Sequence, residues 1–210
     1  MTILESKEIS KSYNDKIIIK NINLELKQGE FVSIVGKSGT GKTTLLHILG
    51  KILNPTSGSI NYNPPNLKPA MVFQEYNKSL FPWLTVFQNL KLVLNSNLES
   101  LDEHILYYLS LVGLEHSKNK YPWELSSGMQ QRVSIARALV YKPSILLMDE
   151  PFGSLDSGTK NDLESDLLDL WKKLNLTILM ITHDIEEAIF MSNRVLILSE
   201  NNSGFKDCIK

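Results

Sequence analysis

The sequence lacks several features that would narrow its class. Its 210 residues include one cysteine, Cys208, so no internal disulfide can form and a reducing cytosol is compatible. No apolar run approaches the ~20 residues that span a bilayer. The first residues, MTILE, have neither the basic start nor the apolar core of a signal peptide. We therefore expect any connection to a membrane to come through a partner protein.

Neither sign of charge dominates the chain. The sequence has 22 Lys and Arg residues and 23 Asp and Glu residues, which gives a net charge of −1. Broad, sequence-independent nucleic-acid binding needs a clustered positive surface, so we expect no nucleic-acid partner. A hydrophobic content of 42% is that of a soluble globular protein. The length fits one large domain, or one domain with an inserted subdomain.

The most informative stretch runs from Glu30 to Leu49. An apolar run of strand length, FVSIV, precedes the residues GKSGTGKT, which fit G-x-x-x-x-G-K-[ST] and lead into a helical TLLHIL. The glycines let successive N–H groups line one anion-binding concavity, and the helix N-terminus adds its positive dipole end. We predict that Lys42 contacts the β- and γ-phosphates of a nucleoside triphosphate and that the Thr43 hydroxyl reaches Mg²⁺. A chance glycine turn is disfavoured, because both the strand and the helix are present.

Two carboxylates close a second apolar strand, Ile145 to Met148. Ligand-contacting residues of a parallel sheet are expected at such strand ends. Asp149 suits the Mg²⁺ shell, and Glu150 can accept a proton from an attacking water. The alternative is a pair of surface carboxylates with no role in chemistry.

Other polar residues follow strands or open a helix. Gln74 ends one strand and either contacts metal or water, or is a plain surface glutamine. His183 ends another and either touches the γ-phosphate or is an ordinary polar residue. Ser126 or Ser127 is either a helix N-cap alone or part of a second anion site. A phosphate loop with a separate anion site in one chain indicates that two copies share a nucleotide.

Hydrophobic periodicity indicates an α/β protein with a phosphate-loop nucleotide-binding core and a mainly parallel sheet. We expect an antiparallel β-subdomain before the phosphate loop and an inserted α-helical subdomain over residues 76–140, with the core formed by residues 1–75 and 141–200. Residues 201–210 read as a short, poorly ordered polar tail. Helices are predicted over Thr85–Leu94, Leu101–Leu111, Ser127–Val140, Thr159–Leu174 and Ile185–Met191.

Taken together, these motifs resemble the nucleotide-binding subunit of ATP-binding-cassette (ABC) transporters over nearly the whole chain. Residues 36–43 match Walker A, Gln74 the Q-loop, residues 125–129 the signature motif, residues 145–150 Walker B, residues 154–156 the D-loop and His183 the switch histidine. The resemblance implies an ATPase that uses ATP and Mg²⁺. It assigns catalytic roles to Glu150, His183 and Gln74 and metal contacts to Thr43, Gln74 and Asp149. It assigns nucleotide contacts to Tyr13, Gly36, Ser38, Gly39, Gly41, Lys42, Thr43, Thr44, Ser126, Gly128 and Asp156.

The resemblance also implies a head-to-tail homodimer, with each ATP between Walker A of one copy and the signature motif of the other. Tyr13 matches the aromatic position that stacks on adenine, and the alternative is a strand-end aromatic without that role. Ser127 and Met129 depart from the usual L-S-G-G-Q. A serine would be strained if its position needed a positive φ, and would cost little if the position were helical, which we favour. The chain ends soon after the strand Val195–Leu198, so we expect no C-terminal regulatory domain in cis.

A finer match, in FPWLTV and YPWEL, resembles the importer branch for nitrate, sulfonates and taurine, which also includes transporters of heterocyclic thiamine precursors. It implies transmembrane permease subunits, a solute-binding protein in the system, and a location at the cytoplasmic face of the cell (inner) membrane. Phe81 and Trp83 suit a socket for a permease helix, or else pack within the helical subdomain. The alternatives are a soluble cassette ATPase acting on DNA or ribosomes, and an inactive assembly module. The former usually carries a coiled-coil insertion or a second cassette, and Glu150 and His183 argue against the latter.

Overall fold

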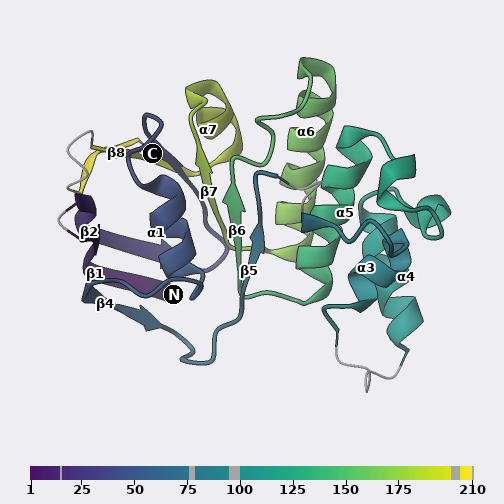
Figure 1. The fold of residues 1–210 in the computed structure, drawn as a ribbon, viewed down its shortest axis with the longest axis horizontal. Helices are drawn as coiled ribbons and strands as arrows, with labels where there is room; N and C mark the ends of the chain where they lie inside the picture. The colour runs from purple at the N-terminus through teal and green to yellow at the C-terminus, as the bar shows by residue number, and fades with distance from the viewer. Residues whose placement is uncertain (15, 76–78, 95–99, 200–203, 210) are drawn as a thin grey trace.

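Two β-sheets organise the chain, and a group of helices lies beside the larger one (Figure 1). The computed structural model describes residues 1–14, 16–75, 79–94, 100–199 and 204–209. The smaller sheet is antiparallel, with the order β2-β1-β4, and contains β1 (Thr2–Tyr13), β2 (Lys16–Lys27) and β4 (Ser57–Tyr62). Alternating buried positions along β2, such as Ile22, Leu24 and Leu26, give it one buried face.

The larger sheet has the order β5-β6-β7-β3-β8-β9. Its strands are β5 (Pro69–Val72), β6 (Ile145–Asp149), β7 (Ile178–Thr182), β3 (Phe31–Val35), β8 (Arg194–Leu198) and β9 (Phe205–Ile209). All neighbouring pairs are parallel except β8 and β9. Every residue of β3, β6 and β7 is buried, as expected when both faces of a parallel sheet are covered.

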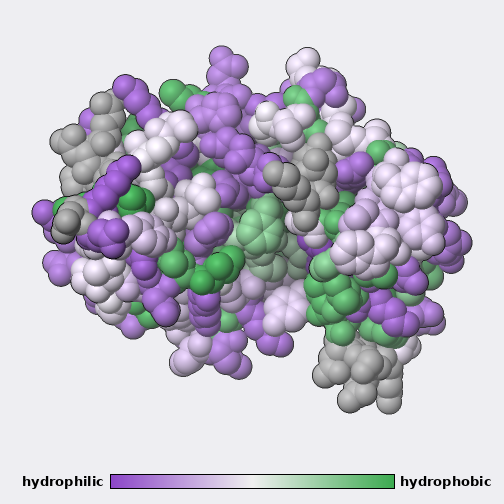
Figure 2. Space-filling view, in the orientation of Figure 1, coloured by the Kyte–Doolittle hydropathy of each residue, from purple (hydrophilic) through white to green (hydrophobic). Residues whose placement is uncertain are grey.

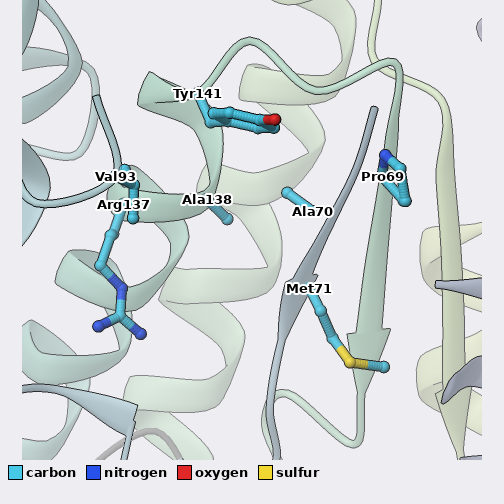
Figure 3. Close-up of a pocket in the computed structure, with 7 residues that line it drawn as sticks. All are labelled: Pro69, Ala70, Met71, Val93, Arg137, Ala138 and Tyr141. Atoms are coloured by element: carbon cyan, nitrogen blue, oxygen red, sulfur yellow. The ribbon is translucent and has the colours of Figure 1, made fainter. Parts of the chain in front are cut away.

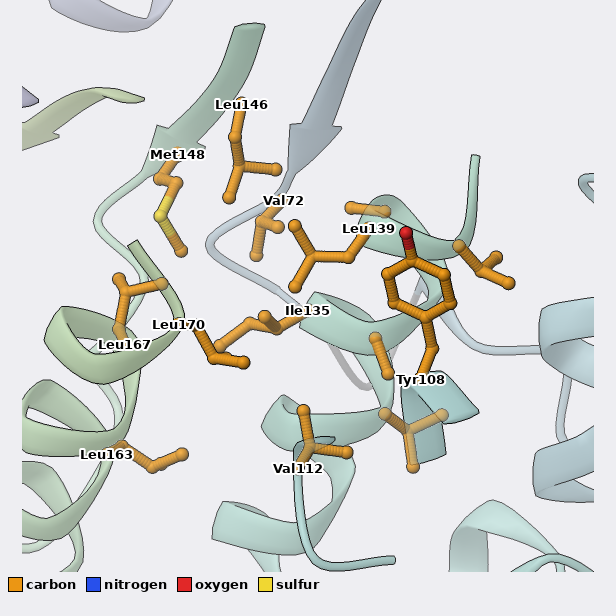
Figure 4. Close-up of a cluster of buried hydrophobic side chains, with 14 of the residues drawn as sticks. Val72, Tyr108, Val112, Ile135, Leu139, Leu146, Met148, Leu163, Leu167 and Leu170 are labelled. Carbon is orange, nitrogen blue, oxygen red and sulfur yellow. The ribbon is translucent and has the colours of Figure 1, made fainter. Parts of the chain in front are cut away.

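Helices cover both faces of this sheet. They are α1 (Lys42–Leu49), α3 (Val86–Lys91), α4 (Leu101–Leu111), α5 (Ser127–Val140), α6 (Ser157–Leu174) and α7 (Ile185–Met191), with short 3₁₀ turns η1 (Glu115–Ser117) and η2 (Pro122–Glu124). On β6, Ile145 and Leu147 belong to the apolar cluster that contains α1. Leu146 and Met148 point to the other cluster, where α5 and α6 pack (Figure 4). The two helices α1 and α5 therefore lie on opposite faces of the sheet.

The predicted α/β class, with its mainly parallel sheet and antiparallel subdomain, is confirmed. Helices α4, α5 and α7 have the predicted bounds, whereas α6 begins two residues early because Asp156 caps it. The prediction of a poorly ordered tail is wrong for residues 205–209, which form β9 against β8. Residues 76–78 and 201–203, where the helical subdomain and the tail were predicted to begin, lie outside the described residues. Within the described ranges, no helix is both long and apolar enough to cross a membrane.

Candidate nucleotide-binding and hydrolysis site

The phosphate loop connects the end of β3 to the start of α1, as predicted. Gly41 has a φ of 87° and is the N-cap of α1. A Cβ atom there would lie 2.5 Å from Cγ2 of Ile19 on β2, so both the backbone conformation and the space require glycine. The antiparallel sheet thus supports the loop from behind. Ser38 and Gly39 lie exposed at its outer turn.

Lys42 is buried at the mouth of the loop. Its ammonium group donates hydrogen bonds to the carbonyl oxygens of Gly36, at 2.6 Å, and Lys37, at 3.0 Å. Burial lowers the pKa of Lys42, against the opposing effect of the Glu150 and Asp149 carboxylates. A desolvated ammonium group that contacts only neutral acceptors forms a stronger hydrogen bond when an anionic oxygen is available. The loop therefore presents a positive charge to a phosphate.

Asp149 ends β6 directly opposite the loop. Its Oδ1 atom accepts a hydrogen bond from the Thr43 hydroxyl at 3.2 Å, and its side chain is buried. Burial raises the pKa of Asp149, and the Thr43 hydrogen bond acts in the opposite direction. A hydroxyl, a carboxylate and the amide oxygen of Gln74 are hard oxygen donors that fit Mg²⁺. No cluster of three or more His, Cys, Asp or Glu that could hold a metal ion occurs in the described part of the chain.

The Glu150 side chain follows β6 and contacts residues that follow two other strands. Its Oε2 atom lies 3.0 Å from Nδ1 of His183, after β7, and accepts a 3.4 Å hydrogen bond from Nε2 of Gln74, after β5. Glu150 has a φ of 42°, a left-handed conformation that is uncommon for residues other than glycine. Its backbone N–H donates to the carbonyl of Ile181 on β7 at 2.9 Å, which continues the hydrogen bonding between β6 and β7. The sheet therefore gathers a carboxylate, an imidazole and an amide at one edge.

Tyr13 lies at the end of β1 and is 51% exposed. The ammonium group of Lys11 lies 5.1 Å from its ring centroid. The ring is thus accessible on the sheet that supports the phosphate loop, where a stacking role needs it to be. Thr44, predicted to follow the loop, is the third residue of α1.

The signature residues open α5. Ser126 is the N-cap, and its hydroxyl accepts a hydrogen bond from the N–H of Met129 at 3.4 Å. Ser127 is the first residue of the helix and is not among the residues with positive φ, so the expectation of a helical position is confirmed. Gly128 packs so closely on α6 that a Cβ atom would lie 2.5 Å from Cγ2 of Thr159.

The predicted site residues form two groups. Lys42, Thr43, Gln74, Asp149, Glu150 and His183 lie together around the phosphate loop. Ser126 and Gly128 belong to α5, on the face of the sheet opposite α1, and Asp156 caps α6 beside them. One chain does not bring the two groups to the same phosphate.

Several buried polar residues that support the site were not predicted. Asn89 on α3 accepts from the N–H of Phe81 and donates to the carbonyls of Phe81, Leu84 and Thr85, which fixes this loop. Gln131 on α5 donates to the carbonyl of Pro151, next to Glu150, at 2.7 Å. A buried amide within a helix carries no periodic signal, so sequence patterns overlook it.

A pocket of about 300 Å³ lies apart from the predicted site residues (Figure 3). One wall is β5, with Pro69, Ala70 and Met71. The other is the end of α5, with Arg137, Ala138 and the C-cap residue Tyr141, and Val93 also lines the pocket. Arg137 donates to the carbonyl and the hydroxyl of Ser79, at 2.6 and 3.1 Å. Burial lowers the pKa of the Arg137 guanidinium. Arg137 therefore connects the pocket to Ser79.

Comparisons with known proteins agree with this geometry. The family model described as ABC transporter matches residues 19–153. The nitrate import ATP-binding protein NrtD of Synechocystis is 50% identical over 87% of this chain and 71% of its own length. The aliphatic sulfonates import ATP-binding protein SsuB of Bacillus thuringiensis is 41% identical over 92% of this chain and 78% of its own length. The dimeric structure of MJ0796, a bacterial ABC transporter cassette, superposes with a TM-score of 0.84 at 33% identity, covering 99% of this chain and 98% of that one. The chain therefore belongs to the ABC transporter family.

Proposed function

We propose that this chain is the ATP-hydrolysing subunit of an importer for small anionic or heterocyclic solutes of the nitrate, sulfonate and taurine type. It hydrolyses ATP and transmits the resulting motion to transmembrane permease subunits. The observation that carries the proposal is the Glu150 carboxylate in contact with His183 and Gln74, beside a complete phosphate loop. The similarity to import proteins for nitrate and sulfonates supports the solute class.

The proposed roles follow from the position of each side chain. Tyr13 stacks on the base, while Lys42 and the loop from Gly36 to Thr44 bind the phosphates. Thr43, Asp149 and Gln74 would hold Mg²⁺, which neutralises charge on the β- and γ-phosphates when bound. Glu150 accepts the proton of the attacking water. His183 fixes the position of Glu150 relative to the γ-phosphate.

The partners follow from the two separated groups of residues. In a head-to-tail homodimer, Ser126, Gly128 and Asp156 of one copy complete the nucleotide site of the other. We propose a peripheral position at the cytoplasmic face of the inner membrane and a solute-binding protein as a further component. An alternative function on DNA or ribosomes has no support from the import proteins that match this chain or from its net charge of −1.

The permease contact is proposed on the helical side of the chain. Trp83 is 69% exposed and contacts Phe81 edge to face, at 5.4 Å between ring centroids. Leu92 and Val93 are also exposed, and hydrophobic residues gather at the lower right in Figure 2, over the helical part. Apolar side chains of this kind suit the insertion of a short amphipathic helix. Gln74, which contacts Glu150, precedes Trp83 by nine residues in the chain; residues 76–78 lie outside the described part.

The test of hydrolysis is the Glu150→Gln variant. Its amide keeps the shape of the side chain but cannot accept a proton, so ATP turnover should fall by roughly 10²–10⁴-fold while ATP binding persists. Glu103→Gln, which changes an exposed carboxylate on α4, is the matched control and should keep full turnover. Unchanged turnover in Glu150→Gln would refute the role of Glu150 as the base.

The solute class needs a separate experiment. In proteoliposomes with the permease subunits and the solute-binding protein, external nitrate, an alkanesulfonate or a small heterocycle should raise ATP turnover. A system that responds to none of the three would contradict the proposed class without affecting the ATPase assignment.

A further inference from the structure

A single lysine connects the helices that follow the D-loop and the switch histidine. Lys160 lies one turn into α6, and its Nζ atom is 2.6 Å from Oδ2 of Asp184 and 2.8 Å from Oε2 of Glu187 on α7. A third carboxylate, Glu164 on α6, lies 3.7 Å away. The ammonium group is thus surrounded by three acidic side chains from two elements.

These ion pairs cross a gap between the helices. A hollow of about 660 Å³ lies there, lined by residues of both α6 and α7. Lys160, itself 21% exposed, reaches across to Glu187, whose side chain is 2% exposed. Buried charge pairs of this kind resist rearrangement, because separating them leaves a desolvated charge without a partner. Lys160 therefore fixes the separation of the two helix N-termini.

Both ends of this connection lead to predicted site residues. On α6, the N–H of Thr159, the residue before Lys160, donates to the N-cap Asp156 at 3.0 Å. On α7, Asp184 is the N-cap and accepts from the N–H of Glu187 at 3.2 Å. His183 immediately precedes Asp184 and contacts Glu150. The distance between Asp156 and His183 within one copy thus depends on Lys160.

The pKa shifts of Lys160 and Asp184 agree with a strong attachment of α6 to the start of α7. Burial lowers the pKa of Lys160, but hydrogen bonds to Asp184 and Glu187 more than offset this and raise it above its ordinary value. The same hydrogen bond from Lys160 lowers the pKa of Asp184. Lys160 and Asp184 therefore both stay ionised over the physiological range, and their ion pair persists there.

We infer that Lys160 is a positioning residue for ATP hydrolysis, which holds His183 against Glu150 by clamping Asp184 and Glu187 to α6. This inference rests on the roles proposed above for Glu150 and His183. Lys160 has Glu164, Asp184 and Glu187 as its ion-pair partners in the described residues, and these belong to neither the phosphate loop nor the Tyr13 end of β1. Its loss should therefore affect the chemical step and leave ATP affinity unchanged.

The test compares kcat and the dissociation constant for ATP in Lys160→Ala and Lys160→Arg. Because a displacement of about 1 Å in a reacting group costs up to ~10²-fold, we expect kcat to fall by roughly 10- to 100-fold in Lys160→Ala, with the dissociation constant unchanged within about twofold. Lys160→Arg keeps the charge and the reach and should restore most of kcat. Asp166→Asn, which breaks an ion pair from α6 to Arg132 on α5, is the control and should keep wild-type kcat.

A mutant cycle with His183→Ala tests whether Lys160 acts through the histidine. In that background, Lys160→Ala should reduce single-turnover hydrolysis by no more than about twofold further. Full additivity of the two losses, a parallel loss of ATP affinity, or no rescue by Lys160→Arg would overturn the inference. If Lys160→Ala does not fold, Lys160→Ala with Glu187→Gln removes the stranded charge and should show the same loss of kcat. Wild-type turnover in His183→Ala alone would instead refute the proposed role of His183.

Discussion

At the scale of single residues, Glu150 illustrates how the fold orients a reactive group. Its left-handed φ of 42° is unfavourable for a side chain of this size, while its N–H continues the hydrogen bonding to Ile181 on β7. This conformation directs the carboxylate to His183 and Gln74, which come from two neighbouring strands. A strand end with ordinary dihedral angles would continue in the direction of β6 instead.

Asp149 provides a prediction about pH and stability. Because burial raises its pKa above that of the unfolded chain, the ionised carboxylate costs folding free energy at pH values above both pKa values. This cost begins to shrink as the pH falls through the folded-state pKa and is gone below the unfolded-state pKa. Asp149→Asn should therefore raise Tm of the nucleotide-free protein at pH 8 by about 2–4 °C, corresponding to about 1 kcal/mol. The gain should shrink as the pH is lowered.

Thermal melts at several pH values measure this effect. Asp162→Asn, an exposed carboxylate on α6, is the control and should leave Tm unchanged. The Asp149→Asn variant should at the same time lose Mg²⁺-dependent ATP hydrolysis. A variant less stable than the wild type at pH 8 would contradict the prediction, because it would mean that the ionised carboxylate stabilises the empty site.

At the scale of elements, the most predictable helices were α4, α5 and α7, whose bounds match the prediction. Ser126 and Asp184 are caps, and α5 and α7 begin where the sequence indicated. β9 was missed because its stability comes from pairing with β8, not from an alternating pattern of its own. For Gln74, Glu150 and His183, the sequence predicted that each follows a strand, but it did not predict their contacts with one another. The clamp at Lys160 depends on how α6 and α7 meet, which local sequence does not contain.

The contact between α5 and α6 leads to a prediction about Gly128. The family motif assigns this glycine to the partner's phosphate, but within its own chain it lies against the methyl group of Thr159. Gly128→Ala should therefore destabilise the protein by about 1–3 kcal/mol through overpacking. Thr159→Ser removes only that methyl group and should recover most of the loss in the double variant.

Urea unfolding of the two single variants and the double variant measures the coupling. Gly158→Ala is the matched control, because a Cβ atom there meets nothing closer than an Asp156 oxygen at 3.5 Å. Its stability should equal or exceed that of the wild type. If Gly128→Ala is as stable as the wild type, or if Thr159→Ser brings no recovery, then the packing of α5 against α6 does not limit the size of the side chain at position 128.

At the scale of the whole molecule, the separation of α1 from α5 supports the proposed second copy. These helices lie on opposite faces of the same sheet, so Lys42 and Ser126 of one chain are not at one phosphate. Each N-terminus offers unpaired N–H groups to an anion. In the head-to-tail homodimer proposed above, the loop of each copy would lie at the signature helix of the other. The helical position of Ser127 removes the backbone strain that would have weakened this contact.

The Glu150→Gln variant tests this arrangement, because it binds ATP and hydrolyses it slowly, so the closed pair should accumulate. In size-exclusion chromatography with light scattering, ATP and Mg²⁺ should shift its mass from 23.8 kDa to twice that value. Lys42→Ala in the same background removes the charge that binds phosphate, and it should remain a monomer. A monomer at saturating ATP, with binding verified by titration, would mean that Ser126 and Gly128 do not complete the site in the isolated subunit. The pair would then require the permease to hold its two copies together.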